Sequence, residues 1–203
     1  MTREQQRKLK ELKIEENLLH KTLVKEYKLK KRDYMIWKVK DGLFFDMYSS
    51  VLEQDDICKC RVKAKVKPLW ADDLLWDILG MSENKNEPLS LRSNGAFTVS
   101  GVTVFEIECE LPNWETNELR GCLQNSYEAF VSHIEKIDAD YYNNNLNSDR
   151  YHDEIRSLLM LIHTGQYEKA VEYASNMKND YFCNGELSFP MAVIRYCENK
   201  MIY

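Results

Sequence analysis

The residues with the clearest chemical spacing lie in the segment 57–67, ICKCRVKAKVK, in which polar and apolar residues alternate strictly. This period of two predicts a β-strand with one buried face and one face in water. The polar face carries five cations, which are Lys59, Arg61, Lys63, Lys65 and Lys67. One interpretation is that this row of cations binds the phosphates of a nucleic acid or another anionic ligand.

A row of glutamates offers these cations a partner within the chain. Glu106, Glu108 and Glu110 alternate with apolar residues in the segment 105–111. Opposite charges that face each other across a sheet stabilise it by about 0.2–1 kcal/mol per pair. The basic row also lacks the interleaved aromatic residues on which single-strand binders stack bases. We therefore predict cross-strand ion pairs, and a nucleic-acid surface is the less favoured interpretation.

The cysteines and histidines form no recognised metal-binding motif. Cys58 and Cys60 share the apolar strand face, and a zinc ion would need two further ligands. His152 and His163 are separated by about three helical turns, roughly 16 Å, which is too far for one metal ion. Glycine-rich phosphate loops and the common hydrolase motif are also missing from the sequence, so we expect no metal and no cofactor. A Cys–His nucleophilic pair stays open, because such partners meet in space rather than in sequence.

In the segment 70–77, WADDLLWD, two tryptophans flank two aspartates, and a third aspartate follows. One interpretation is a short helix that buries one aromatic side chain against the sheet. The other is a surface that contacts a partner, since aromatic residues are enriched at the centres of protein interfaces. The residues of this candidate interaction surface are Trp70, Asp72, Asp73, Trp76 and Asp77.

The composition predicts a folded cytoplasmic protein. Hydrophobic residues make up 44% and charged residues 30% of the 203 residues, which favours a real core over disorder. No segment approaches the roughly 20 apolar residues of a membrane span, and the polar start of the chain does not resemble a signal peptide. The six cysteines are therefore expected to be reduced thiols.

Charge is unevenly distributed along the chain. Residues 1–40 contain 13 Lys/Arg and 6 Asp/Glu, whereas residues 41–203 contain 15 Lys/Arg and 27 Asp/Glu. The basic start either packs against an acidic surface of its own chain or meets an acidic partner. The acidic remainder suits a basic partner.

Periodicity predicts an α+β fold with an antiparallel sheet of about four strands. The expected strands are 34–40, 43–51, 57–67 and 96–111, and Asp41 and Gly42 form a hairpin turn between the first two. An N-terminal helix, 3–27, packs on the sheet. The other expected helices are 74–81, 115–137, 150–163, 166–178 and 189–200. Residues 1–112 would then form a sheet domain and residues 113–203 a helical segment packed on it, unless the whole chain is one domain.

Two resemblances carry family expectations. The segment 163–174, HTGQYEKAVEYA, resembles the start of the second helix of a tetratricopeptide repeat, with Gly165, Tyr167, Ala170 and Ala174 at the expected spacing. Without a second copy it implies a helical hairpin rather than a repeat array. The basic helix, Lys-rich connector and hairpin at the start resemble small bacterial α+β families, some of whose members are immunity proteins. That resemblance implies an inhibitor that binds a protein.

These observations favour a non-enzymatic, protein-interaction function, with an immunity-like inhibitor of a basic protein as the leading hypothesis. The alternative is an enzyme whose catalytic groups meet in a pocket that no sequence motif marks. The third hypothesis is nucleic-acid binding through the Lys/Arg strand face.

Overall fold

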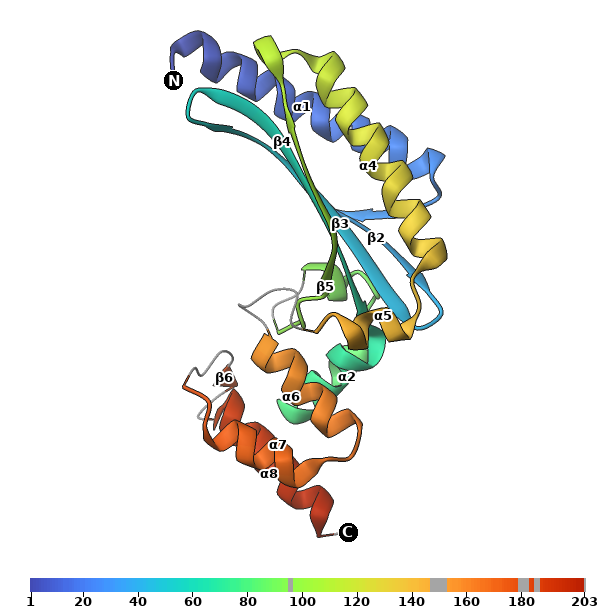
Figure 1. Cartoon of the computed structure of the whole chain (residues 1–203), viewed down its shortest axis with the longest axis vertical. Coiled ribbons are helices and arrows are strands. Elements are labelled where there is room, and N and C mark those ends of the chain that lie inside the picture. The colour runs from blue at the N-terminus through green and yellow to red at the C-terminus, as the bar shows by residue number, and fades with distance from the viewer. Residues whose placement is uncertain (95–96, 147–152, 179–182, 185–186, 203) are drawn as a thin grey trace.

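The computed structural model describes residues 1–94, 97–146, 153–178, 183–184 and 187–202 (Figure 1). Its main feature is a five-stranded antiparallel sheet in which the strands follow one another in sequence order. The strands are β1 (Lys30–Arg32), β2 (Met35–Lys40), β3 (Leu43–Gln54), β4 (Ile57–Pro68) and β5 (Val102–Glu110). The α+β prediction is confirmed, and the sheet has one strand more than expected.

The extra strand is β1, which lies in the segment expected to be a polar connector. Its three residues, KKR, are all charged and carry no apolar alternation that could reveal a strand. The β2–β3 hairpin confirms the predicted turn, because Asp41 and Gly42 both have positive φ angles, as a two-residue turn of this kind requires. Asp55 and Asp56 make the equivalent turn between β3 and β4.

Helices precede and follow the sheet. The long ones are α1 (Arg3–Glu26) and α4 (Thr116–Lys136), and the shorter ones are α2 (Leu69–Ile78), α3 (Leu91–Asn94), α5 (Ala139–Asn144), α6 (Asp153–His163), α7 (Tyr167–Ser175) and α8 (Phe189–Met201). Two 3₁₀ turns, η1 (Ser82–Asn86) and η2 (Pro112–Trp114), and a short hairpin, β6 (Cys183–Asn184) with β7 (Leu187–Ser188), complete the described elements.

The first hydrophobic core lies between one face of the sheet and the two long helices. Both α1 and α4 pack on this face, which we call the covered face (Figure 1). The apolar positions of β4, namely Cys58, Cys60, Val62, Ala64 and Val66, all point into this core and are at most 1% exposed. The predicted two-sidedness of this strand is therefore confirmed.

A second hydrophobic core lies beyond one end of the sheet. It is built by α2, α6, α7 and α8, and the positive φ angle of Gly165 makes the turn between α6 and α7 at the predicted place. The two cores do not divide at residue 112, because α4 belongs to the first core and α2 to the second. The predicted split into 1–112 and 113–203 thus does not coincide with the division of the cores.

None of the helices in the described ranges combines the length and the apolar character needed to cross a membrane.

Candidate functional site

The open face of the sheet, opposite α1 and α4, carries the basic row of β4. The strand register places Lys59, Arg61 and Lys63 opposite Glu110, Glu108 and Glu106 of β5. Glu108 accepts a hydrogen bond from Lys59 Nζ at 2.6 Å and another from Arg61 Nε. Lys63 Nζ lies 3.2 Å from Glu106. The predicted cross-strand pairing is therefore confirmed for these three cations.

The other two cations of the row, Lys65 and Lys67, line a pocket instead. The pocket has a volume of about 450 Å³ and lies between the open face and the segment that leads into β5. That volume is in the range of small-molecule sites. Its polar lining residues are Tyr34, Asp46, Tyr48, Lys65, Lys67, Arg92, Ser93, Thr98 and Ser100.

The two most buried cations of the pocket belong to a charge cluster beneath it. Lys67 is 1% exposed, and its Nζ lies 2.9 Å from Asp72 and donates to the carbonyl oxygens of Arg92 and Val99. Asp72 also accepts from the Val99 amide at 2.8 Å, and Arg92 Nη2 lies 2.6 Å from Asp73. These bonds tie α2, α3 and the segment before β5 to the sheet, so the cluster has a structural role.

Asp46 is the acidic group of the pocket. It lies on β3 opposite Lys65 and is 5% exposed. Burial raises the pKa of its carboxyl to about 6, although Lys67 and then Lys65 act to lower it. A carboxyl that titrates in this range can exchange a proton near neutral pH, which is the property expected of an acid–base group.

Replacing Asp46 with Asn should change the dependence of stability on pH. The folded-state pKa of about 6 exceeds that of an unfolded aspartate, so the native state binds this proton more tightly. The contribution of this carboxyl to the free energy of unfolding is greatest below about pH 4. It falls by up to about 3 kcal/mol as the pH rises through about 6. Relative to the wild type, Asp46→Asn should therefore gain stability between pH 4 and pH 7.

Urea unfolding of both proteins across this pH range measures the difference. The matched control is Asp77→Asn, because that side chain is 32% exposed and lies on α2. A stability difference for Asp46→Asn that stays constant with pH would contradict the raised pKa.

A second polar group links α1, β3 and α4 on the covered face. Ser49 donates to Glu16, His20 Nε2 lies 2.7 Å from Ser49 Oγ, and His20 Nδ1 lies 2.9 Å from Tyr127 Oη. With Glu16 ionised, one arrangement of hydrogens satisfies all three contacts: Nε2–H donates to Ser49 and the Tyr127 hydroxyl donates to Nδ1.

This arrangement resembles a serine–histidine pair but does not favour nucleophilic catalysis. The Ser49 proton points to Glu16 rather than to the imidazole. Burial, and then the nearby charge of Lys31, lowers the pKa of His20 to about 4, so the ring is a poor general base at neutral pH. The group is better explained as a satisfied buried network.

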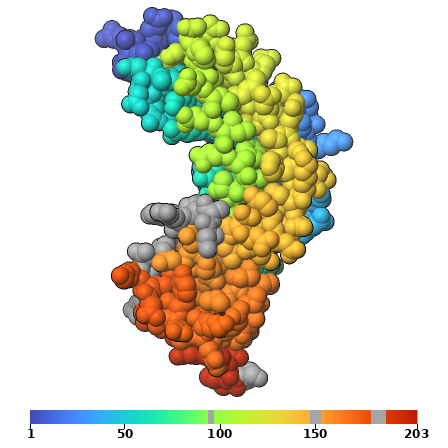
Figure 2. Space-filling view, in the orientation of Figure 1, coloured from blue at the N-terminus to red at the C-terminus, as the bar shows by residue number. Residues whose placement is uncertain are grey.

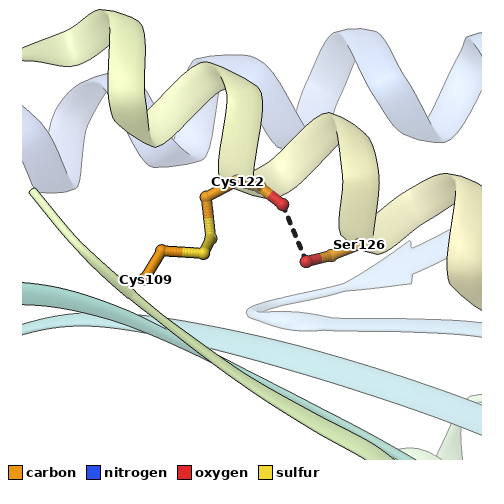
Figure 3. The surroundings of a disulfide bond; sticks show 3 residues. All are labelled: Cys109, Cys122 and Ser126. Atoms are coloured by element: carbon orange, nitrogen blue, oxygen red, sulfur yellow. Dashed lines mark hydrogen bonds between the residues drawn. A yellow bond between two sulfur atoms is a disulfide. The ribbon is translucent and has the colours of Figure 1, made fainter.

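The cysteines differ from the sequence expectation at one pair. Cys109 of β5 and Cys122 of α4 form a disulfide, with Cα atoms 6.3 Å apart (Figure 3). The expectation of reduced thiols is wrong for this pair, because α4 lies across the covered face of β5 and brings the two side chains together. Cys58, Cys60 and Cys197 are free and buried.

The free thiols are poorly suited to chemistry. Burial raises the pKa of Cys60 to about 12 and that of Cys197 to about 11, which keeps both protonated at neutral pH. Within the described ranges no three His, Cys, Asp or Glu side chains are placed to hold a metal ion. His152, whose separation from His163 argued against a shared metal ion, lies outside the described residues.

The residues of the candidate interaction surface lie on different sides of one helix. The five residues, Trp70, Asp72, Asp73, Trp76 and Asp77, all lie on α2. Asp72 and Trp76 are 0% exposed, because one is in the charge cluster and the other donates its Nε1–H to the Phe97 carbonyl at 2.8 Å. Those two residues cannot touch a partner in this structure.

The other three residues are more accessible but already have partners. The ring of Trp70 stacks on His163 with centroids 3.8 Å apart. Asp77 accepts a hydrogen bond from Lys85 at 2.6 Å, and the Asp73 side chain is 36% exposed. An interaction surface on α2 stays a prediction, and Trp70, Asp73 and Asp77 would have to form it.

Sequence reasoning missed Asp46 and the pocket around it. One signal was available, since Asp46 interrupts the apolar run LFFDM of a predicted strand. A charged residue in such a run often marks a paired or functional group. The residues that close the pocket, 92–93 and 98–101, gave no comparable signal, because they were divided between a polar loop and the start of the strand expected at 96–111.

Comparison of the chain with protein-family models, with curated proteins and with solved structures found no match. The resemblances to tetratricopeptide repeats and to immunity-protein organisation therefore stay predictions. The function proposed below rests on the described residues of this chain.

Proposed function

We propose that this chain is a non-enzymatic protein that binds a basic protein partner, in the manner of an immunity-like inhibitor. The observation that carries the proposal is the acidic outer side of α4, which runs along the outside of the molecule (Figures 1 and 2). Six exposed carboxylates lie on this helix and beside its ends: Glu115, Glu118, Glu128, Glu135, Asp138 and Asp140. Arg120 and Lys136 are the cations of the same stretch, and Lys40 of β2 pairs with Glu135 at 2.9 Å.

The other five carboxylates form no ion pair with a described cation, because the cations of β4 face away from α4. Lys59, Arg61 and Lys63 pair with Glu108 and Glu106 on the open face, and Lys67 and Arg92 pair with Asp72 and Asp73 of α2. Carboxylates that lack such neighbours attract a basic partner and speed its association.

Neutralising the acidic side of α4 should weaken capture of the partner. The variant is Glu115→Gln/Glu118→Gln/Glu128→Gln, in which Gln keeps the size of each side chain. Affinity capture from native lysate should recover a protein with the wild type at low salt, less of it at high salt, and at least about tenfold less with the variant.

The matched control changes the same number of exposed glutamates on α7 and α8: Glu168→Gln/Glu172→Gln/Glu198→Gln. This control should capture the partner as the wild type does. Equal capture by both variants, or capture that does not respond to salt, would argue against the α4 surface.

A second candidate function is an enzyme or small-ligand protein that uses the pocket at Asp46. The specific observation in its favour is the raised pKa of this carboxyl inside a pocket of about 450 Å³. A thermal-shift screen of small metabolites would support it if one compound stabilises the wild type and not Asp46→Asn.

The cytoplasmic location expected from the sequence is part of the leading proposal.

A further inference from the structure

A basic groove lies on the other edge of the molecule, away from β5. The C-terminal half of α1, the turn after it, β1 and the start of β2 form its walls, and the groove has a volume of about 820 Å³. Its basic lining residues are Lys21, Lys25, Lys30, Lys31 and Arg32.

The groove contains five cations and no carboxylate. None of Lys21, Lys25, Lys30, Lys31 and Arg32 forms an ion pair with any carboxylate of the described residues. They differ in this respect from four of the five cations in the row on β4, which pair with carboxylates of the chain itself. Unpaired cations that share a concave surface raise the local concentration of a negatively charged ligand.

The remaining lining of the groove is apolar. Val24 and Leu29 contribute aliphatic surface, and Lys30 Nζ lies 4.9 Å above the ring of Trp37. Trp37 is 5% exposed and its other neighbour is Phe44, stacked with a centroid distance of 5.4 Å. Neither face of this indole is therefore open for stacking on a nucleobase, which disfavours single-stranded nucleic acid.

The position of the groove also bears on the occupant. β1 is an edge strand of the sheet, and an extended peptide can lie along such an edge. Apolar surface among cations fits a segment in which carboxylates and apolar side chains occur together.

We propose that this groove binds an acidic peptide segment of a partner protein, with carboxylates on the five cations and an apolar side chain against Val24 and Leu29. This site is opposite in charge to the acidic side of α4. The two proposals can therefore be tested separately, and failure of one does not affect the other.

Fluorescence anisotropy with a labelled short peptide of glutamate and leucine tests the site on the full chain. The wild type should bind this peptide at low salt, and a peptide with serine in place of each leucine should bind several-fold more weakly. Lys25→Glu/Lys30→Glu should weaken binding of the first peptide by at least about tenfold. The matched control, Lys136→Glu/Lys178→Glu, should bind as the wild type does.

The serine comparison uses the unmodified protein, so it remains decisive if the groove variant fails to fold. Three results would overturn the proposal: no peptide binding at low salt, equal loss in the groove variant and its control, or equal affinity for the two peptides. Tighter binding of a single-stranded oligothymidylate or of phosphatidylglycerol vesicles, lost in Lys25→Glu/Lys30→Glu, would assign the groove to that ligand and overturn the peptide.

Discussion

Replacing Asp72 with Ala should lower the free energy of unfolding by about 3–5 kcal/mol, the largest effect expected from any single charged residue. Asp72 is fully buried and lies 2.9 Å from the Nζ atom of Lys67, which is itself 1% exposed. Removing the carboxylate leaves a buried ammonium group without its counter-ion. The Val99 amide also loses its hydrogen-bond acceptor.

Chemical unfolding monitored by circular dichroism measures this loss. Asp77→Ala is the matched control, because Asp77 also lies on α2 and also pairs with a lysine, but its side chain is 32% exposed. A pair of this kind contributes about 0–1 kcal/mol. Similar losses for the two variants would show that the buried charge cluster does not hold the segment before β5.

Replacing Gly101 with Ala should also destabilise the protein, by about 1–3 kcal/mol. A Cβ atom at this position would lie 2.7 Å from the backbone oxygen of Val66, which cannot move without shifting β4. This close approach of two backbones gives the position a steric reason to be glycine.

Gly121→Ala should instead stabilise the protein. Gly121 lies away from both ends of α4 and is exposed to solvent, and no atom lies within 4 Å of an added Cβ. Alanine in such a position stabilises a helix by about 0.5–1 kcal/mol relative to glycine. Thermal unfolding measures the change in stability of Gly101→Ala and of Gly121→Ala. Destabilisation by both substitutions would contradict the steric explanation for Gly101.

The regular elements could be predicted from the sequence because their periodicity is a local property. The alternation in 57–67 predicted the buried face of β4 and, together with that in 105–111, the partners of three of its five cations. β1 could not be predicted in the same way, since its three charged residues gain their strand conformation from pairing with β2. Tertiary pairing determined this element, and no local pattern indicated it.

The disulfide could not be predicted from the sequence for a different reason. Cys109 was expected on the apolar face of a strand, and Cys122 lies beside Leu119 and Leu123 of the predicted helix stripe. Both positions thus pointed toward a core, but only the packing of α4 on β5 determines that they face each other. The expectation of a reducing compartment then favoured free thiols.

The candidate sites depend even more on the tertiary structure. The pocket at Asp46 and the groove at Lys25 each combine side chains from segments separated by more than twenty residues. The candidate surface at 70–77 relied on sequence neighbours, and a helix places such neighbours on different sides. This is why Asp72 and Trp76 are buried while Asp73 and Asp77 are partly exposed.

Carbodiimide cross-linking of the wild-type chain to its captured partner tests the proposed binding function most directly, because this reagent joins carboxylates to lysines in contact with them. Mass spectrometry of the product should locate the cross-links at Glu115, Glu118 and Glu128, at the start and on the exposed side of α4. Cross-links confined to the glutamates of β5 or to the aspartates of α2 would contradict the account and place the partner on another surface.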